Sequence, residues 1–208
     1  MALENIQNLL ENSLEEVEAL LEALLEEIEE VETRKWMQYF MQSKGHRLRP
    51  ILVLLSYKCF RPLEKEPVEL IKLAAAVELL HTASLIHDDV IDEEQIRRSQ
   101  DSLNSLKGNK VSILIGNVFY LKAFELASQL PHEEYFLSMV KTSMEMCFGE
   151  IIQSEKLEEF LDEASYLNII ERKTAKLMAF CCESGALLAG AGEEQVSQMA
   201  ELGLSLGY

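Results

Sequence analysis

The sequence predicts an all-α protein, an antiparallel bundle of helices, and three observations support this prediction. Apolar residues recur at helical spacing along most of the chain. No convincing alternation of apolar and polar residues, which would indicate half-buried strands, is present. The 208 residues are 48% hydrophobic, which is enough to bury a substantial core. We therefore expect residues 1–208 to form one all-α domain.

Three helices are expected in the N-terminal part of the chain. Residues 14–28 carry an apolar stripe with glutamates on the other faces, which is typical of an amphipathic helix. A second helix covers about 31–42 and is closed by Lys44-Gly45. A third covers about 50–60, because proline is favoured in the first turn of a helix and Pro50 begins this segment.

Glycine and proline delimit the later helices. The longest expected helix, 68–92, contains neither residue type. Breaks at Pro62, Pro67, Gly108, Pro131 and Gly190-Ala191-Gly192 leave further helices at about 110–129, 132–157 and 162–189, with a last one from Glu193. This last segment reaches the C-terminus with apolar leucines that nothing covers, so we expect the domain to be incomplete at its C-terminus.

Charge and composition exclude several classes of function. The net charge is −17, so nucleic acid is not an expected partner, because its phosphates require a basic binding face. No apolar run reaches the roughly 18 residues that a membrane span needs. The start of the chain lacks the basic and apolar regions of a signal peptide. We expect a cytoplasmic protein with no membrane span, whose four cysteines are reduced.

The distribution of aspartate marks a candidate site. The chain has five aspartates against thirty-one glutamates, and three of the five are Asp88, Asp89 and Asp92. Aspartate is a poorer helix former than glutamate, so its concentration here needs a reason. Asp88 and Asp92 share a helix face, and close carboxylates repel unless a cation lies between them. Mg²⁺, which bridges carboxylates to phosphates, is the expected ion; a metal-free carboxylate pair for acid–base catalysis is the alternative.

Paired arginines favour a phosphate ligand. Four of the seven arginines form two pairs, Arg47 with Arg49 and Arg97 with Arg98. Arginine makes bidentate contacts with phosphate, although surface cations of no special function would look the same. His81 lies seven residues before Asp88, on the same helix face, and is a candidate donor to diphosphate.

Five segments together resemble the trans-polyprenyl diphosphate synthases, a family of isoprenoid-synthase fold. The segments are 45–50, 78–92, 97–98, 149–153 and 173–175. The first reads GHRLRP where the family has GKRLRP, and the second ends in DDVID, which matches the family's first aspartate-rich motif, DDxxD. The resemblance runs from about residue 30 to the end of the chain.

The resemblance implies a fold, a reaction and roles for single residues. The fold would be an antiparallel helical bundle of the isoprenoid synthase type around a central apolar cavity. The reaction would be the Mg²⁺-dependent head-to-tail condensation of isopentenyl diphosphate onto an allylic prenyl diphosphate, in a homodimer. By position, Asp88, Asp89 and Asp92 would hold the metal, Arg97 the allylic diphosphate, and His46, Arg49, His81 and Arg98 isopentenyl diphosphate. Asp88 and Asp92, with Lys173 and Thr174 beside the allylic group, would be the catalytic residues.

Small residues before the aspartates bear on product length. In this family, bulky aromatic residues just before the motif stop chain growth early. Here these positions are Ala83 and Ser84, and Val77 lies on the same helix face as Ser84. An open channel and a product longer than farnesyl diphosphate are therefore expected. The alternative is that small residues only permit close helix packing.

Four departures from the family pattern leave other functions open. His46 replaces a lysine, the loop after Arg97 reads RRSQDS instead of RRGxPT, and Asn117 stands where an aspartate is common. The second aspartate-rich motif is absent, so the 208 residues alone are expected to be incomplete as an enzyme. The alternatives are a non-catalytic diphosphate-binding homologue or a subunit of a heteromeric synthase, a class I terpene cyclase and a purely structural bundle.

Overall fold

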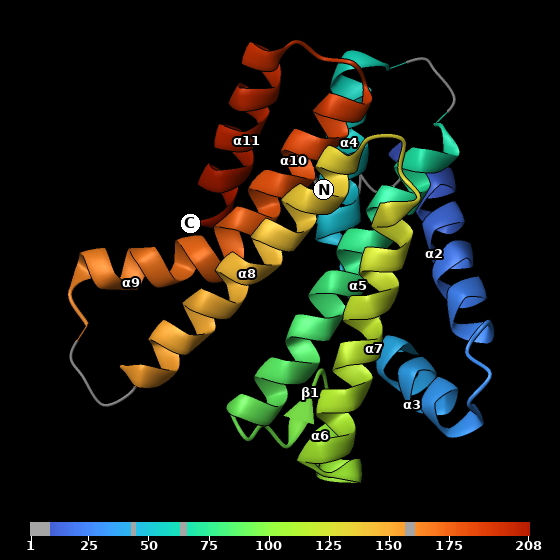
Figure 1. Ribbon diagram of the computed structural model, residues 1–208, viewed down its shortest axis with the longest axis vertical. Helices are drawn as coiled ribbons and strands as arrows, with labels where there is room; N and C mark the ends of the chain where they lie inside the picture. The colour runs from blue at the N-terminus through green and yellow to red at the C-terminus, as the bar shows by residue number, and fades with distance from the viewer. Residues whose placement is uncertain (1–8, 43–44, 63–65, 157–160) are drawn as a thin grey trace.

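The segments whose apolar residues recur at helical spacing form long helices, and their apolar faces are buried. The computed structural model describes residues 9–42, 45–62, 66–156 and 161–208 (Figure 1). In chain order the helices are α2 (Glu11–Glu26), α3 (Val31–Gln42), α4 (Leu48–Phe60), α5 (Val68–Ile91), α6 (Leu103–Lys107), α7 (Asn109–Ser128), α8 (Glu133–Glu155), α9 (Glu163–Ile170), α10 (Lys176–Leu188) and α11 (Glu193–Gly207). The prediction of an all-α antiparallel bundle is confirmed. Lys44 and Leu157, two predicted helix boundaries, lie outside the described residues.

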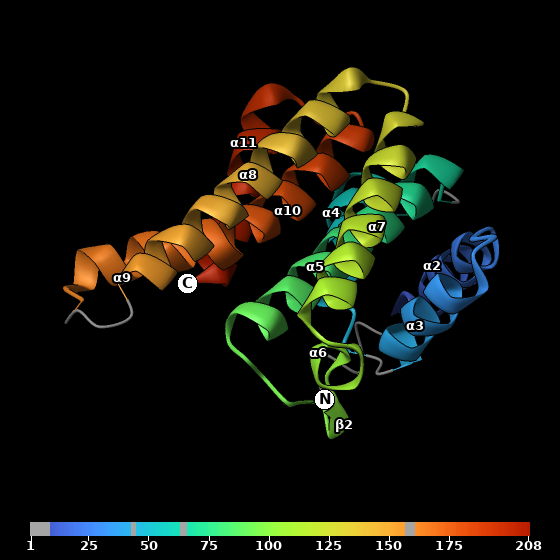
Figure 2. The same ribbon diagram turned by 60° about the horizontal axis from the view of Figure 1, so that its bottom comes forward.

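Helix α5 is the centre of the bundle. It is apolar around nearly its whole circumference, which is the pattern of a helix buried on all sides. It packs against α7 and α4, while α10 packs against α4 and α11 (Figure 1). Helices α2 and α3 lie on the other side of the α5–α7 pair from α8, α10 and α11 (Figure 2). The residues at the C-terminal end of α5 are thereby held in a fixed frame.

Helices α5 and α7 are long and apolar enough to cross a membrane by length and composition alone. In the α5 window, 72% is buried inside the protein, and in the α7 window 39% is buried. Core helices of soluble proteins share these properties, because a helix buried on all sides is apolar all round. The expectation that the chain has no membrane span stays a prediction.

A short hairpin follows α5 and was not predicted. Strands β1 (Ile96–Arg97) and β2 (Gln100–Asp101) pair antiparallel around Arg98 and Ser99. Both turn residues have positive φ, 49° and 63°, as in a type I′ turn. Strands of two residues are too short to leave an alternating pattern in the sequence.

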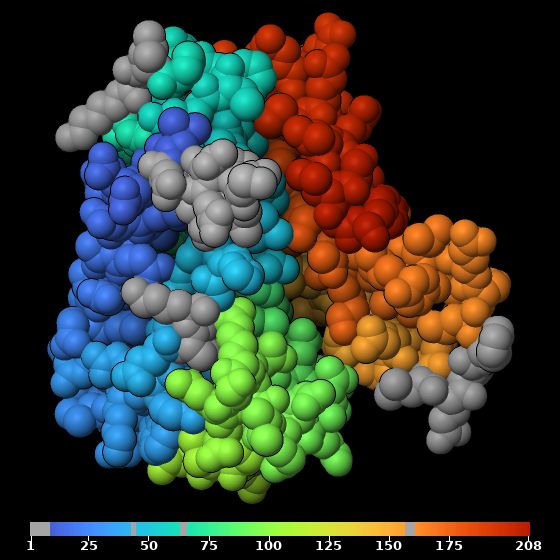
Figure 3. Space-filling model, turned by 180° about the vertical axis from the view of Figure 1, so that it is seen from behind, coloured from blue at the N-terminus to red at the C-terminus, as the bar shows by residue number. Residues whose placement is uncertain are grey.

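The predicted helix 162–189 is interrupted. Residues Glu171–Ala175 form a π-helical turn, η1, between α9 and α10. Such turns are rare and often occur at functional sites, and this one carries Lys173 and Thr174. Figure 3 shows α9 standing out from the body of the molecule as a separate lobe.

Candidate metal and diphosphate site

Asp88 and Asp92 lie together at the C-terminal end of α5. Asp88 is in the last turn, and Asp92 caps the helix with its N–H donating to the carbonyl of Asp88 at 2.8 Å. The end of a helix where carbonyls are unpaired carries partial negative charge, so carboxylates are unfavourable there without a cation. The structure therefore supports the predicted pairing of these two residues on one face.

The pKa of Asp88 is raised by its surroundings at the end of α5. Burial raises the pKa of this carboxyl to about 6. The nearby Lys173 opposes the shift, while the negative charges of Glu150 and Asp92 add to it. A divalent cation would relieve both the desolvation and the repulsion.

The carboxylate pair fits a Mg²⁺ ion of the kind the sequence predicts. Among the described residues, no group of three or more His, Cys, Asp or Glu side chains is arranged to hold a metal. Mg²⁺ in enzymes typically takes one or two carboxylates and completes its coordination with water and substrate phosphates. Asp88 and Asp92 supply such a pair of oxygen donors.

Asp89 points to different partners. Its side chain is buried, and Arg97 of β1 donates from Nε to its Oδ1 at 2.5 Å. Asn104 donates to its backbone carbonyl at 3.1 Å. Asp89 thus ties the hairpin and α6 to the end of α5. The ion pair engages Oδ1 of Asp89, while Oδ2 has no hydrogen-bond partner among the described residues.

A cavity of about 240 Å³ lies beside Asp88, between α5, α7, α8 and η1. Its lining includes Ser84, Asp88, Tyr120, Cys147, Glu150 and Lys173. Ser84 therefore lies where the sequence predicts a channel residue. Val77 and Ala83 are fully buried and are not among the residues lining this cavity.

Lys173 is fixed in this cavity by α8. Its Nζ forms an ion pair with Glu150 and donates to Oε1 of Gln153 at 3.1 Å. Glu150 is buried, so Lys173 balances a carboxylate charge that is largely shielded from water. A Cβ on Gly149 would lie 2.8 Å from Cγ of Lys173, so only glycine permits this approach. Thr174 is half-buried beside Lys173.

A second cluster gathers positive charge around His81. Burial lowers the pKa of His81 well below its usual range, and the charges of Arg49 and Arg98 lower it further. Arg49 is itself mostly buried, and its Nε has no hydrogen-bond partner among the described residues. Like charges held together in a buried setting favour an anion. Three of the four residues predicted to bind isopentenyl diphosphate therefore act on one another in the structure.

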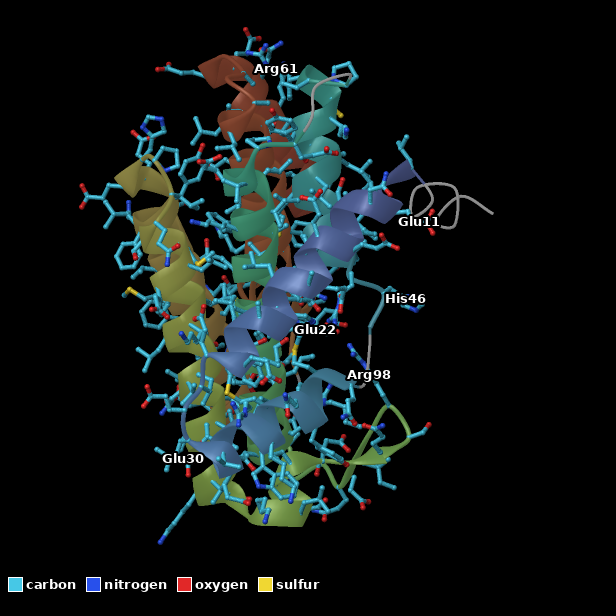
Figure 4. The ribbon with its side chains drawn as sticks, turned by 90° about the vertical axis from the view of Figure 1, so that its right-hand side faces the viewer. Glu11, Glu22, Glu30, His46, Arg61 and Arg98 are labelled. Carbon is cyan, nitrogen blue, oxygen red and sulfur yellow. The ribbon has the colours of Figure 1, made fainter. Side chains whose placement is uncertain are left out.

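His46, the fourth predicted residue, is exposed. Figure 4 shows His46 and Arg98 on the same edge of the molecule. The guanidinium of Arg98 lies against Gly45, where an added Cβ would be 2.6 Å from a terminal nitrogen. A side chain at position 45 would therefore displace the Arg98 guanidinium from its place beside this segment.

Two further residues at the site were not predicted. Tyr120 of α7 lines the cavity, and its ring stacks on Phe124 with the centroids 6.2 Å apart. His87 packs 5.4 Å from the ring of Tyr120 and its Nε2 lies 3.2 Å from the carbonyl of Ile113, so this histidine packs α5 against α7. The only sequence signal for Tyr120 was an aromatic residue in an apolar helix, which is usually core.

Residues 30–208 match the sequence model of the family described as polyprenyl synthetase. The chain belongs to this family. The polyprenyl synthetase match covers all the residues of the two clusters described above. It leaves out α2, which precedes residue 30.

Curated relatives of this polyprenyl synthetase family member are prenyl diphosphate synthases. An octaprenyl diphosphate synthase from Haemophilus influenzae is 35% identical over 170 residues, covering 81% of this chain and 51% of the relative. Heptaprenyl diphosphate synthase component 2 from Geobacillus stearothermophilus is also 35% identical, with 81% and 52% covered. The chain thus spans about half the length of the curated relatives it matches.

Solved structures share the fold closely. A decaprenyl diphosphate synthase from Rhodobacter capsulatus superposes with a TM-score of 0.92 at 29% identity, over 99% of this chain and 62% of that one. A polyprenyl synthase from Caulobacter crescentus, complexed with calcium and isoprenyl diphosphate, gives 0.91 at 29% identity, over 99% and 62%. The predicted isoprenoid synthase fold is confirmed.

Proposed function

We propose that the chain acts in a trans-polyprenyl diphosphate synthase that condenses isopentenyl diphosphate head to tail onto an allylic prenyl diphosphate. The observation that carries this proposal is the arrangement at the end of α5. The carboxylate of Asp88 lines a cavity, and Asp92 caps the same end of the helix. His81, also on α5, is acted on by the charges of Arg49 from α4 and Arg98 from the hairpin turn. Family membership supports the same reaction class.

Asp88 and Asp92 would hold Mg²⁺ for this reaction. The ion, when bound, supplies charge stabilisation to the allylic diphosphate as it leaves. The Caulobacter neighbour is complexed with calcium and isoprenyl diphosphate, which supports a divalent cation here. The negative end of α5 and the raised pKa of Asp88 favour the same conclusion.

The protein's own side chains would bind and orient the two substrates. Arg49, Arg98 and His81, with His46 at the rim, would hold the diphosphate of isopentenyl diphosphate. Lys173, fixed by Glu150, would lie beside the allylic group together with Thr174. The apolar part of the cavity wall would limit the access of water to the allylic cation, which water would otherwise hydrolyse.

A product longer than farnesyl diphosphate is part of the proposal. Ser84 lines the cavity, and the residues at 77 and 83 are small. Tyr120 on the facing wall is the aromatic residue that would narrow the cavity. Relatives named octaprenyl, heptaprenyl and geranylgeranyl diphosphate synthase support this proposal, because their named products are longer than farnesyl diphosphate.

A homodimer in the cytoplasm is also proposed. The outward face of α7 exposes large apolar side chains, with Leu114 63% and Leu121 65% exposed. Apolar surface of this kind commonly marks a protein–protein interface. No nucleic-acid partner is proposed, because a net charge of −17 disfavours contact with phosphates.

A subunit of a heteromeric synthase, or a non-catalytic diphosphate-binding homologue, is the second candidate. One relative is named component 2 of a heptaprenyl diphosphate synthase. His46, in place of a lysine, is exposed and carries a charge that depends on pH. On this reading the chain binds Mg²⁺ and diphosphate but does not catalyse condensation alone.

Turnover separates the two candidates. Purified protein is incubated with Mg²⁺, farnesyl diphosphate and labelled isopentenyl diphosphate, and the products are separated by length. The synthase proposal expects labelled products longer than farnesyl diphosphate, lost in Asp88→Ala. Metal-dependent substrate binding without products would favour the second candidate, and unchanged turnover in Asp88→Ala would refute the metal assignment.

A further inference from the structure

Arg47 lies between two predicted diphosphate ligands in the sequence, yet its side chain contacts carboxylates. Its Nε donates to Oε1 of Glu18 at 2.5 Å, and a second nitrogen donates to Oε2 of Glu18 at 3.2 Å. A third donates to Oε1 of Glu78 at 2.6 Å. The Arg47 side chain is only 11% exposed. One positive charge is thus held between two negative ones.

The backbone of Arg47 has an unfavourable conformation at the start of α4, and the ion pairs help to hold it there. Its φ is 52°, in the left-handed region, where a residue with a Cβ costs roughly 1–2 kcal/mol. Arg47 is also the N-cap of α4, and its side chain makes no cap hydrogen bond. The carbonyl of Arg47 accepts the N–H of Ile51 at 3.0 Å, the first helical hydrogen bond of α4. The ion pairs offset the strain and fix where α4 begins.

The segment around Arg47 touches the diphosphate site on both sides. Two residues earlier, Gly45 lies under the guanidinium of Arg98. Two residues later, Arg49 is mostly buried in the first turn of α4. Glu78 also acts on Arg49, whose pKa it raises against the effect of burial. A shift of Arg47 would therefore move both Arg49 and the surface that supports Arg98.

Glu18 comes from a part of the chain outside the family match. Helix α2 ends at Glu26, and the match begins at residue 30. The buried face of α2, with Val17 and Leu21, packs on the bundle and holds Glu18 in place. Figure 4 shows α2 crossing the bundle on the side where His46 and Arg98 lie. The N-terminal helix thus reaches the segment around Arg47 through the carboxylate of Glu18.

We propose that Arg47 is a positioning residue, anchored by Glu18 of α2 and Glu78 of α5, that holds segment 45–49 in place for diphosphate binding. Arg47 itself does not bind the substrate, because two carboxylates already neutralise its charge. The identity of the ligand rests on the proposed function. The anchoring does not, since it concerns the order of the segment in the free protein.

Hydrogen exchange of the Ile51 amide tests the anchoring without any substrate. In Glu18→Gln we expect this amide to exchange at least about tenfold faster, because the bond to the Arg47 carbonyl opens more often. Glu22→Gln is the matched control, since Glu22 lies one turn along α2 and forms no ion pair in the described part of the chain. Amides in α10 are expected to be unchanged in both variants, which separates local opening from global unfolding. Wild-type exchange at Ile51 in Glu18→Gln would overturn the proposal.

Titration with inorganic diphosphate tests the consequence for binding. We expect Glu18→Gln to bind about tenfold more weakly than wild type, with Glu22→Gln unaffected. In turnover, KM for isopentenyl diphosphate should rise while kcat and KM for the allylic substrate stay constant, which a general loss of stability would not produce. Wild-type diphosphate affinity in Glu18→Gln would overturn the positioning role. Wild-type affinity in Arg49→Gln would instead refute the proposed diphosphate site, and Ile51 exchange would still decide the anchoring.

Discussion

At the scale of single residues, the site depends on which way three neighbouring aspartates point. Their excess in a glutamate-rich chain predicted a cation site. The structure divides them, with Asp88 lining the cavity, Asp92 exposed at the end of α5, and Asp89 buried against Arg97. Helix spacing alone did not predict this division, since Asp89 is three residues from Asp92 and residues at that spacing can share a helix face. The pairing with Arg97 was not predictable, because it depends on a hairpin that leaves no sequence pattern.

His81 gives a residue-scale prediction about pH. Its pKa is well below its usual range because of burial and the neighbouring arginines. In the unfolded chain a histidine takes up a proton near pH 6.5, while folded His81 stays neutral. The unfolded state then binds more protons, so this residue lowers the free energy of unfolding as the pH falls below about 6.5.

Urea unfolding of wild type and His81→Gln between pH 5 and pH 8 measures this contribution. As the pH falls from 8 to 5, we expect the unfolding free energy of wild type to decrease more than that of His81→Gln. An NMR titration of the His81 ring should also show its pKa rise when inorganic diphosphate is added, because the anion offsets the arginine charges. A His81 ring that titrates near pH 6.5 in the free protein would contradict the account.

At the scale of elements, most helices were predictable and their interruptions were not. Residues 31–42 form α3 as predicted, because periodicity and the following glycine agree. The predicted start of α4 at Pro50 was two residues late, since Arg47 caps the helix in a left-handed conformation. The π-helical turn at Lys173 and the hairpin at Arg97 depend on tertiary contacts. The missed elements are those that position site residues.

The hairpin turn makes a testable prediction about stability. Ser99 has a φ of 63°, a conformation that costs a residue with a Cβ roughly 1–2 kcal/mol. Glycine avoids this cost, but it makes the unfolded chain more flexible, which lowers the unfolding free energy by about 0.4–1 kcal/mol. We expect Ser99→Gly to raise the unfolding free energy by about 0.5–1 kcal/mol in urea denaturation. Ser99→Ala, which keeps a Cβ, is the control and should not stabilise.

The cavity wall makes a prediction about product length. Ser84 lines the cavity opposite Tyr120, so a ring at position 84 would fill the space beside Asp88. We expect Ser84→Phe to shorten the products separated after turnover, and Tyr120→Ala to lengthen them. Products of unchanged length in both variants would show that the growing chain leaves the site by another route.

At the scale of the whole molecule, several large exposed apolar side chains lie on other faces than the candidate site. The outward face of α7 carries Leu114 and Leu121, while the face toward α5 supports the cavity. Leu202 and Leu206 of α11 are also exposed. Sequence periodicity identified these residues as apolar, but it did not say which faces the bundle would leave uncovered.

Self-association through α7 is expected from this surface. Replacing Leu114 by lysine puts a charge into the interface, where an unpaired charge is costly. We expect Leu114→Lys to shift the protein from dimer to monomer in sedimentation velocity. Leu202→Lys, on the exposed face of α11, is the matched control and should leave the association state unchanged. A wild-type protein that sediments as a monomer would refute the dimer.

The central claim is that Asp88 and Asp92 bind diphosphate through Mg²⁺. Calorimetric titration with inorganic diphosphate, with and without Mg²⁺, tests it most directly. We expect wild type to bind more tightly with Mg²⁺, and the double variant Asp88→Asn with Asp92→Asn to lose this gain. Asp101→Asn, an exposed aspartate of the hairpin, should behave as wild type. A double variant that keeps the full effect of Mg²⁺ would contradict the account.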